Sequence, residues 1–170
     1  MPNILITGYP RVGKTTLIKR LVESTGKKVV GFVTSEIKEH NRRRGFSIES
    51  FSGLKLLLAS KENTQSKYHV ASYGVYLENI DTIVDQIKLD LTTTDYELIV
   101  LDEIGKMELF SLKFKTFVER CLEQNCVLGT IMLKDNNFTN KIKNRSDTVV
   151  YQLTEKNRGQ AENDIIKMMI

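Results

Sequence analysis

A glycine-containing segment near the start of the sequence has the residue types and spacing of a phosphate-binding loop. Residues 8–15 read Gly-Tyr-Pro-Arg-Val-Gly-Lys-Thr, which fits G-x-x-x-x-G-K-[ST] in full. In such a loop, backbone N–H groups at a helix start point at phosphate oxygens, and glycines let the backbone approach them. Lys14 would lie between the β- and γ-phosphates of a nucleoside triphosphate, and the Thr15 hydroxyl would join the Mg²⁺ shell. The predicted phosphate-contacting residues are Gly8, Tyr9, Pro10, Arg11, Val12, Gly13, Lys14, Thr15 and Thr16.

Two adjacent acids further along the chain suggest the rest of such a site. Residues 97–103 read Glu-Leu-Ile-Val-Leu-Asp-Glu, an apolar run that ends in two carboxylates. Ligands of open α/β sheets bind outside the carboxyl ends of the strands, so Asp102 is predicted to hold Mg²⁺. Glu103 would polarise the water that attacks the γ-phosphate, a contribution of about 10² to 10⁴ in rate. The alternative is that both acids cap a helix or lie in solvent.

The elements around these residues have the pattern of alternating strands and helices. Apolar runs predict strands at residues 3–7, 28–37, 97–101, 127–132 and 148–153. Helical spacing of apolar residues predicts helices that contain residues 17–22, 80–87 and 114–122, and Thr154 is a candidate N-cap for a closing helix. The phosphate loop therefore stands between a strand and a helix, as its motif requires, rather than in an ordinary turn with a surface lysine.

The order of these elements predicts the fold class. Strands separated by amphipathic helices favour a three-layer α/β fold with a mainly parallel sheet. Residues 28–37, the polar stretch 38–44 and the run 46–51 look like an antiparallel β-hairpin inserted after the first helix. A turn at Ser52-Gly53 then leads into residues 54–59. A length of 170 residues favours a single domain that spans residues 1–170.

Composition limits the remaining classes. The sequence has 41% hydrophobic and 27% charged residues, typical of a globular protein, and no stretch resembles a secretion signal or a membrane span. We therefore expect a cytoplasmic protein without a membrane partner. Cys121 and Cys126 have no partner group for zinc and are interpreted as small core residues. The net charge of +4 leaves a nucleic-acid partner open.

Beyond the two motifs, the chain resembles the small P-loop nucleoside-triphosphatase family of thermophiles, which includes the animal cancer-related nucleoside-triphosphatase. Family-like segments follow in family order over nearly the whole chain, and the most specific is Asp-Glu-Ile-Gly-Lys-Met-Glu-Leu at residues 102–109. The others are residues 31–36, 44–46, 73–75, 129–131 and 157–158.

The resemblance implies a RecA-like sheet and hydrolysis of ATP, GTP, CTP and UTP to diphosphates with loose base selectivity. It implies a second nucleotide-contacting segment made of Leu98, Ile99, Val100, Leu101, Asp102, Glu103, Ile104 and Gly105. Arg11 departs from the family, which usually has glycine there, so we expect a negative φ at this position. A monomer is favoured over an oligomer.

Other cations and two other functions stay open at this stage. Lys106 could reach a transition-state oxygen, and Arg42, Arg43 and Arg44 could act as an arginine finger, although a solvated hairpin tip is favoured for them. The rivals to a triphosphatase are a small-molecule or nucleotide kinase, which needs an acceptor pocket, and a non-catalytic nucleotide-dependent RNA-associated switch.

Overall fold

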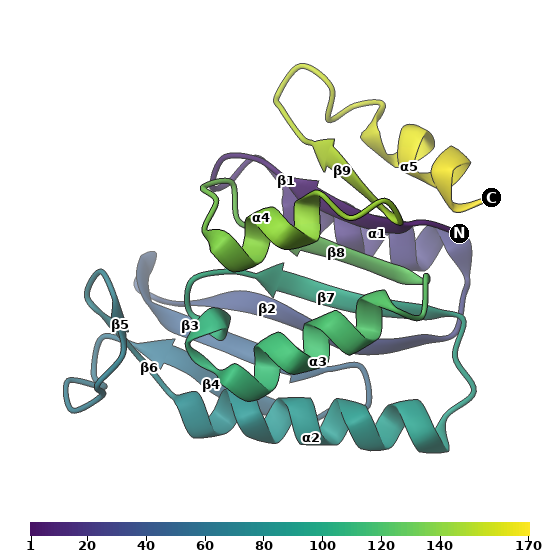
Figure 1. Cartoon of the computed structure of the whole chain (residues 1–170). Coiled ribbons are helices and arrows are strands. Elements are labelled where there is room, and N and C mark those ends of the chain that lie inside the picture. The colour runs from purple at the N-terminus through teal and green to yellow at the C-terminus, as the bar shows by residue number, and fades with distance from the viewer.

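A nine-stranded mixed sheet spans the protein in the computed structural model, which describes residues 1–170 (Figure 1). The strands are β1 (Asn3–Thr7), β2 (Val29–Glu39), β3 (Arg42–Ser50), β4 (Lys55–Ser60), β5 (His69–Val70), β6 (Tyr73–Val75), β7 (Leu98–Ile104), β8 (Val127–Ile131) and β9 (Thr148–Gln152). Their order across the sheet is β5-β6-β4-β3-β2-β7-β8-β1-β9.

Five of these strands form a parallel half that is covered by helices on both faces. Strands β2, β7, β8, β1 and β9 all pair in parallel, and every residue of β1 and β8 is buried. Helices α2 (Leu77–Thr93), α3 (Leu112–Leu122) and α4 (Asn137–Lys143) cover one face, and α1 (Lys14–Thr25) and α5 (Ala161–Met169) cover the other (Figure 1). A separate hydrophobic cluster fills each side. The predicted three-layer α/β fold is confirmed.

The other half of the sheet is the antiparallel insert that the sequence predicted after the first helix. Strands β2 and β3 form a hairpin, and β4 and β6 extend it, with β5 at the edge. His40 and Asn41 make the hairpin turn with φ of 48° and 60°, the positive values that match the twist of the flanking strands. The polar residues on either side of this turn are therefore strand rather than loop.

Two details near the C-terminus differ from expectation. Thr154 does not cap the closing helix, because its hydroxyl accepts a hydrogen bond from Asn157 N (3.3 Å) in a turn that precedes α5. The N-cap of α5 is Gln160. Helix α4 was not predicted: it is short, and reciprocal hydrogen bonds between Asn136 and Thr139 start it.

The two cysteines have different surroundings, and this predicts different reactivity. Cys121 is buried in the core and Cys126 is half-buried beside it; burial raises the pKa of both thiols. Because the thiolate is the reactive form, we expect iodoacetamide to alkylate Cys126 slowly and Cys121 hardly at all in the folded protein. Peptide mass spectrometry checks this, with the guanidinium-unfolded protein as the control in which both react. Equal alkylation rates in the folded state would contradict the burial of Cys121.

Candidate functional site

The phosphate loop connects β1 to α1, and its two glycines have distinct reasons to be glycine. A Cβ on Gly8 would lie 2.5 Å from the carbonyl oxygen of Leu153, in the segment that follows β9, so a side chain has no room. Gly13 caps α1 with a φ of 106°, a conformation that other residues rarely adopt. The loop therefore approaches its neighbours by backbone alone and leaves the N–H groups of the α1 N-terminus facing outward.

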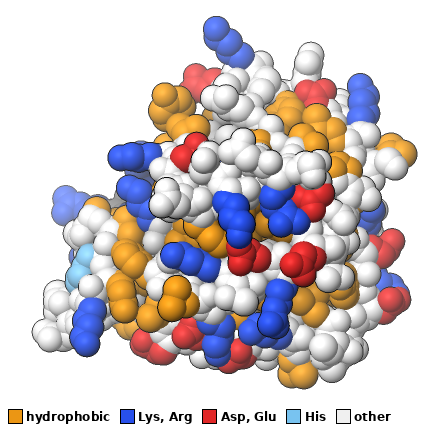
Figure 2. Space-filling model, in the orientation of Figure 1, with side chains coloured by type: hydrophobic (Ala, Val, Ile, Leu, Met, Phe, Trp, Pro, Cys, Tyr) orange, Lys and Arg blue, Asp and Glu red, His pale blue; other side chains and the backbone are white.

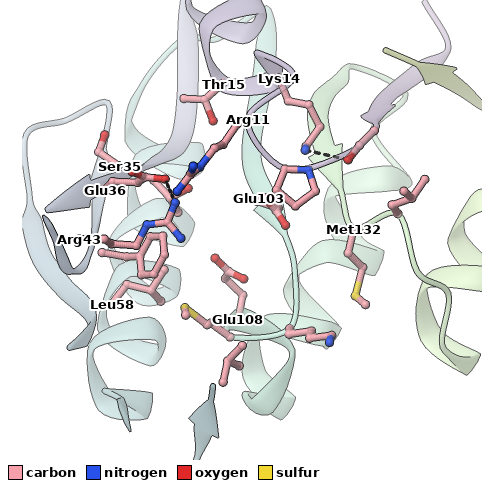
Figure 3. A pocket seen from close by; sticks show the side chains of 18 of the residues that line it. Arg11, Lys14, Thr15, Ser35, Glu36, Arg43, Leu58, Glu103, Glu108 and Met132 are labelled. Carbon is pink, nitrogen blue, oxygen red and sulfur yellow. Dashed lines mark hydrogen bonds and ion pairs between the residues drawn. The ribbon is translucent and has the colours of Figure 1, made fainter. Parts of the chain in front are cut away.

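The backbone conformation of Arg11 differs from the one expected from the sequence. Its φ is +67°, in the left-handed region, whereas a negative φ was expected for a bulky residue there. The loop thus keeps the backbone shape that suits glycine and forces the arginine to adopt it. The exposed side chain points into the cavity described below (Figure 3).

This conformation predicts a measurable effect on stability. Arg11→Gly is expected to raise the free energy of unfolding by up to about 1 kcal/mol, because relief of the left-handed strain outweighs the added freedom of the unfolded chain. The β-branched variant Arg11→Val should instead lower it by about 1–2 kcal/mol. Urea unfolding of both variants tests the pair. A loss of stability in Arg11→Gly comparable to that in Arg11→Val would show that side-chain contacts, not backbone strain, dominate.

Lys14 and the two acids lie close together, as the sequence predicted. The Lys14 ammonium donates hydrogen bonds to the carbonyl oxygens of Gly8 (2.9 Å) and Tyr9 (3.1 Å). Its positive charge also acts on Asp102 and Glu103, where it lowers the pKa of each carboxyl against larger opposing effects. Strands β1 and β7 are parallel with β8 between them, so their carboxyl ends share one edge of the sheet.

Asp102 is fully buried at the end of β7 and is only half satisfied. Its Oδ1 accepts a hydrogen bond from the Thr130 hydroxyl at 2.6 Å, while its Oδ2 is buried with no hydrogen-bond partner. Burial raises the pKa of Asp102, and the hydrogen bond from Thr130 together with the nearby Thr15 hydroxyl opposes that rise. An orphaned carboxylate oxygen beside a threonine hydroxyl is the donor set that a hard divalent cation would satisfy.

Glu103 follows Asp102 directly in the chain, and the Glu103 side chain lines a cavity whereas Asp102 does not. Burial raises the pKa of the Glu103 carboxyl, with Asp102 adding to the rise and Lys14 opposing it. A carboxylate that is partly desolvated in this way binds a proton more readily than one in water. Glu103 can therefore accept a proton from a group held in the cavity.

The cavity has a volume of about 860 Å³ and runs from the phosphate loop to the antiparallel insert (Figure 3). Its lining near the loop consists of Gly8, Pro10, Arg11, Gly13, Lys14, Thr15 and Thr16. Other lining residues come from β2, β3, β4, β5, β7 and the segments that follow β7 and β8. The volume lies at the upper end of the range of about 300–1,000 Å³ for ligand pockets.

Some predicted contact residues do not line this cavity. Leu98–Leu101 and Ile104 are fully buried in the two hydrophobic clusters, so their side chains build the sheet. Val12 packs into the cluster around α1, and the Tyr9 side chain is exposed and does not line the cavity. Gly105 lies beneath the Glu103 side chain. The predicted second nucleotide-contacting segment, residues 98–105, therefore mainly holds Asp102 and Glu103 in place.

The structure also brings in residues that sequence reasoning did not single out. Glu108 lines the cavity although it is only 4% exposed, and Thr130 bonds Asp102. Both residues lie in segments that resemble the family, and this resemblance was the one signal in the sequence that could have identified them. Glu36 and Arg43 form an ion pair at the cavity wall, and the Arg43 guanidinium also lies 5.3 Å from the centre of the Phe46 ring.

The favoured interpretation of the arginine run was therefore only partly right. Arg42 and Arg44 are exposed, but Arg43 is half-buried in the cavity. All three lie in β3, and the exposed Arg42 directly follows the hairpin turn at His40 and Asn41. Lys106 also lines the cavity.

Surface charge is mixed on the face covered by α2, α3 and α4. Figure 2 shows Lys and Arg side chains interspersed with Asp and Glu on this face. Several form exposed ion pairs, such as Lys113 with Asp85 and Lys141 with Glu119. This face therefore presents no uniformly basic surface for a nucleic acid. No helix of the structure has the length and apolar character required to cross a membrane.

Comparison with known proteins agrees with this geometry. The family model described as NTPase matches residues 3–166. The nucleoside-triphosphatase THEP1 of Thermotoga maritima is 41% identical, with 98% of this chain and 95% of that protein covered. The crystal structure of THEP1 from Aquifex aeolicus superposes with a TM-score of 0.85 at 37% identity over 99% of each chain. The solution structure of a human cancer-related nucleoside triphosphatase superposes with a TM-score of 0.78 at 32% identity, covering 99% of this chain and 97% of that one. The chain has the phosphate loop and the paired acids, and it is similar to these proteins over nearly its full length. It therefore belongs to the NTPase family.

Proposed function

We propose that the protein is a Mg²⁺-dependent nucleoside triphosphatase that hydrolyses ATP, GTP and other triphosphates to diphosphate and phosphate. The observation that carries this proposal is that one cavity joins an anion-binding helix N-terminus with Lys14 and Glu103, beside the buried Asp102. A triphosphate needs the helix N-terminus and Lys14 to balance the charge of its phosphates. Its hydrolysis needs a base that accepts a proton from the attacking water, and Glu103 is the candidate. The relatives are named nucleoside triphosphatases, in agreement with a nucleoside triphosphate as substrate.

The phosphate loop would bind the polyphosphate. Backbone N–H groups of the loop and of the α1 N-terminus would donate to phosphate oxygens. Lys14, whose ammonium already lies against the loop carbonyls, would move its charge onto the β- and γ-phosphates. It would hold the developing negative charge during transfer.

Thr15 and Asp102 would hold the magnesium ion. The unpaired Oδ2 of Asp102 and the neighbouring Thr15 hydroxyl fit a hard cation whose other ligands are phosphate oxygens and water. When bound, the ion neutralises charge on the phosphates and orients them for in-line attack. Thr130 would keep the Asp102 carboxylate in place through its hydrogen bond to Oδ1.

Glu103 would activate the attacking water. The water donates a proton to the Glu103 carboxylate while its oxygen bonds to the γ-phosphorus, and the bond to the β,γ-bridging oxygen breaks. Glu103 lines the cavity, and the nearby positive charge of Lys14 favours its ionised form, which can accept that proton. A triphosphate substrate and two free cysteines both favour a cytoplasmic site of action.

Phosphate release from ATP, GTP, CTP and UTP tests the proposal. We expect release from all four with Mg²⁺ and almost none when the metal is chelated. Release from a single triphosphate would contradict the broad selectivity. Tight binding of triphosphates without any release would contradict hydrolysis itself and favour a switch.

A further inference from the structure

We propose that Arg11 is a further catalytic residue of the triphosphatase: its guanidinium group binds the terminal phosphate and stabilises the negative charge that develops there during hydrolysis. This inference deepens the proposed function and rests on it, because it assigns a role to another side chain of the same phosphate loop. It depends on the direction of the Arg11 side chain, its lack of partners, its backbone conformation and the charges of the cavity.

The Arg11 side chain extends from the phosphate loop across the place where the reacting phosphate must lie. In Figure 3 it points toward Glu36 on β2 and Arg43 on β3. The strands that follow β1 across the sheet are β8, β7, β2 and β3, so this direction crosses the carboxyl end of β7. Glu103 stands at that end, and it lines one cavity together with Arg11 and Lys14. A triphosphate bound to the loop therefore places its terminal phosphate within reach of Arg11.

The Arg11 guanidinium group is free to bind an anion. None of the ion pairs of the structure includes Arg11, and its exposed side chain donates no hydrogen bond to another residue. By contrast, Arg43 already pairs with Glu36 and lies against the Phe46 ring, and Lys14 bonds to carbonyl oxygens of the loop. Arg11 can therefore bind a phosphate without breaking an existing contact.

The backbone of Arg11 supports a functional role for this residue. Its φ of 67° lies in the left-handed region, which is uncommon for residues other than glycine. The other non-glycine residues with positive φ are His40, Asn41, Ala71 and Asn125, and none of them lines the cavity. Strained backbone residues concentrate at active sites and ligand-binding loops. A side chain that meets the terminal phosphate explains why such a residue occurs inside the phosphate loop.

The charges that line the cavity leave the two cations of the loop for the substrate. Arg11 and Lys14 are the charged residues of the loop, which contains no acid. Outside the loop, three acids and three cations line the cavity and balance each other: Glu36, Glu103, Glu108, Arg43, Lys106 and Lys134. A triphosphate bound to one Mg²⁺ keeps a net charge of about −2. Lys14 would balance one of these charges, and Arg11 supplies the second.

Arg11 acts by charge and hydrogen bonding, without proton transfer. A guanidinium group stays protonated in proteins, so Arg11 neither gives nor takes a proton in this step. As the water oxygen bonds to the γ-phosphorus and the bond to the β,γ-bridging oxygen breaks, negative charge spreads over the oxygens of the phosphoryl group. The planar guanidinium group can donate to two of these oxygens at once. Because the contact strengthens as the charge develops, it lowers the barrier to hydrolysis.

Calorimetry with two nucleotides tests the contact to the terminal phosphate. Arg11→Gln keeps a polar side chain but removes the charge. With Mg²⁺ present, it is expected to weaken binding of the imido analogue of ATP about tenfold and to leave binding of ADP, which lacks that phosphate, nearly unchanged. Arg20→Gln, at an exposed arginine on α1 outside the cavity, is the matched control and should bind both nucleotides like the parent. An equal loss for both nucleotides, or no loss for either, would overturn the inference.

Chemical rescue of hydrolysis provides the second readout. Arg11→Gly, which relieves the strained backbone, should unfold no more readily than the parent and yet release phosphate more slowly by a factor of about 10². Millimolar guanidinium chloride should restore part of this rate, because the free ion can occupy the space that the side chain leaves. Urea at the same concentration has a similar shape without the charge and should restore none of it.

The outcomes separate this inference from the proposed function. Phosphate release at the parent rate in both Arg11→Gln and Arg11→Gly would overturn the role of Arg11 while leaving the triphosphatase intact. Equal recovery of the Arg11→Gly rate with urea and with guanidinium would show that Arg11 acts through its shape, and this would overturn the inference as well. Failure of the parent chain to bind or hydrolyse any triphosphate would instead refute the proposed function.

Discussion

Glu103→Gln is expected to lower the rate of triphosphate hydrolysis by a factor of about 10² or more, with little change in triphosphate affinity. Glutamine keeps the shape of the side chain that lines the cavity next to Lys14 but accepts a proton far less readily than a carboxylate. Steady-state phosphate release gives the rate, and calorimetry with a non-hydrolysable analogue gives the affinity. The change therefore separates proton transfer from substrate binding.

The matched control is Glu23→Gln, an exposed glutamate on α1 outside the cavity, which should hydrolyse at the parent rate. Hydrolysis by Glu103→Gln at the rate of this control would disprove the general-base role. The neighbouring Glu108 would then be the next carboxyl to examine, because it approaches the same point above Gly105.

Lys14→Ala is expected to weaken triphosphate binding by a factor of about 10 to 10² and to reduce turnover as well. A charge-assisted hydrogen bond contributes about 1.5–3 kcal/mol, and Lys14 would make such bonds to the phosphates. Its loss should weaken ATP binding far more than binding of adenosine, which carries no phosphate. Calorimetry with the imido analogue of ATP and with adenosine measures the difference.

Lys167→Ala, an exposed lysine on α5, is the control for the loss of one positive charge. Both variants lower the net charge equally, so a general electrostatic effect would weaken binding in both. Equal affinity for the triphosphate analogue in Lys14→Ala and Lys167→Ala would mean that the phosphate loop does not bind polyphosphate as proposed.

Local patterns in the sequence were sufficient for the parallel core and its motifs. Continuous apolar runs such as residues 127–132 predict strands buried on both faces, and β8 is such a strand. The phosphate-loop motif requires a strand before it and a helix after it, and β1 and α1 satisfy that requirement. These predictions succeed because periodicity and glycine placement depend on interactions within a few residues.

Predictions that depended on a residue's surroundings were less successful. Thr154 has the chemistry of an N-cap, but Asn157 uses its hydroxyl in a preceding turn. The sequence also suggested that Arg11 would avoid a positive φ, yet the loop geometry imposes one. Arg43 was expected at a solvated tip, but its register opposite Lys38 places it in β3 with Glu36 as its ion-pair partner. In each case a neighbouring element, not local propensity, set the outcome.

The sequence alone determined the α/β class, the phosphate loop and the acid pair, because each can be recognised from residues that are contiguous in the chain. Only the tertiary structure decided that Glu108, Phe46 and Leu58 share a cavity with Glu103, and that Asp102 retains one unpaired oxygen. The physical reason is that strand order and side-chain burial arise from packing between distant segments. Residues 46, 58, 103 and 108 become neighbours only when β3, β4 and β7 take their places in one sheet.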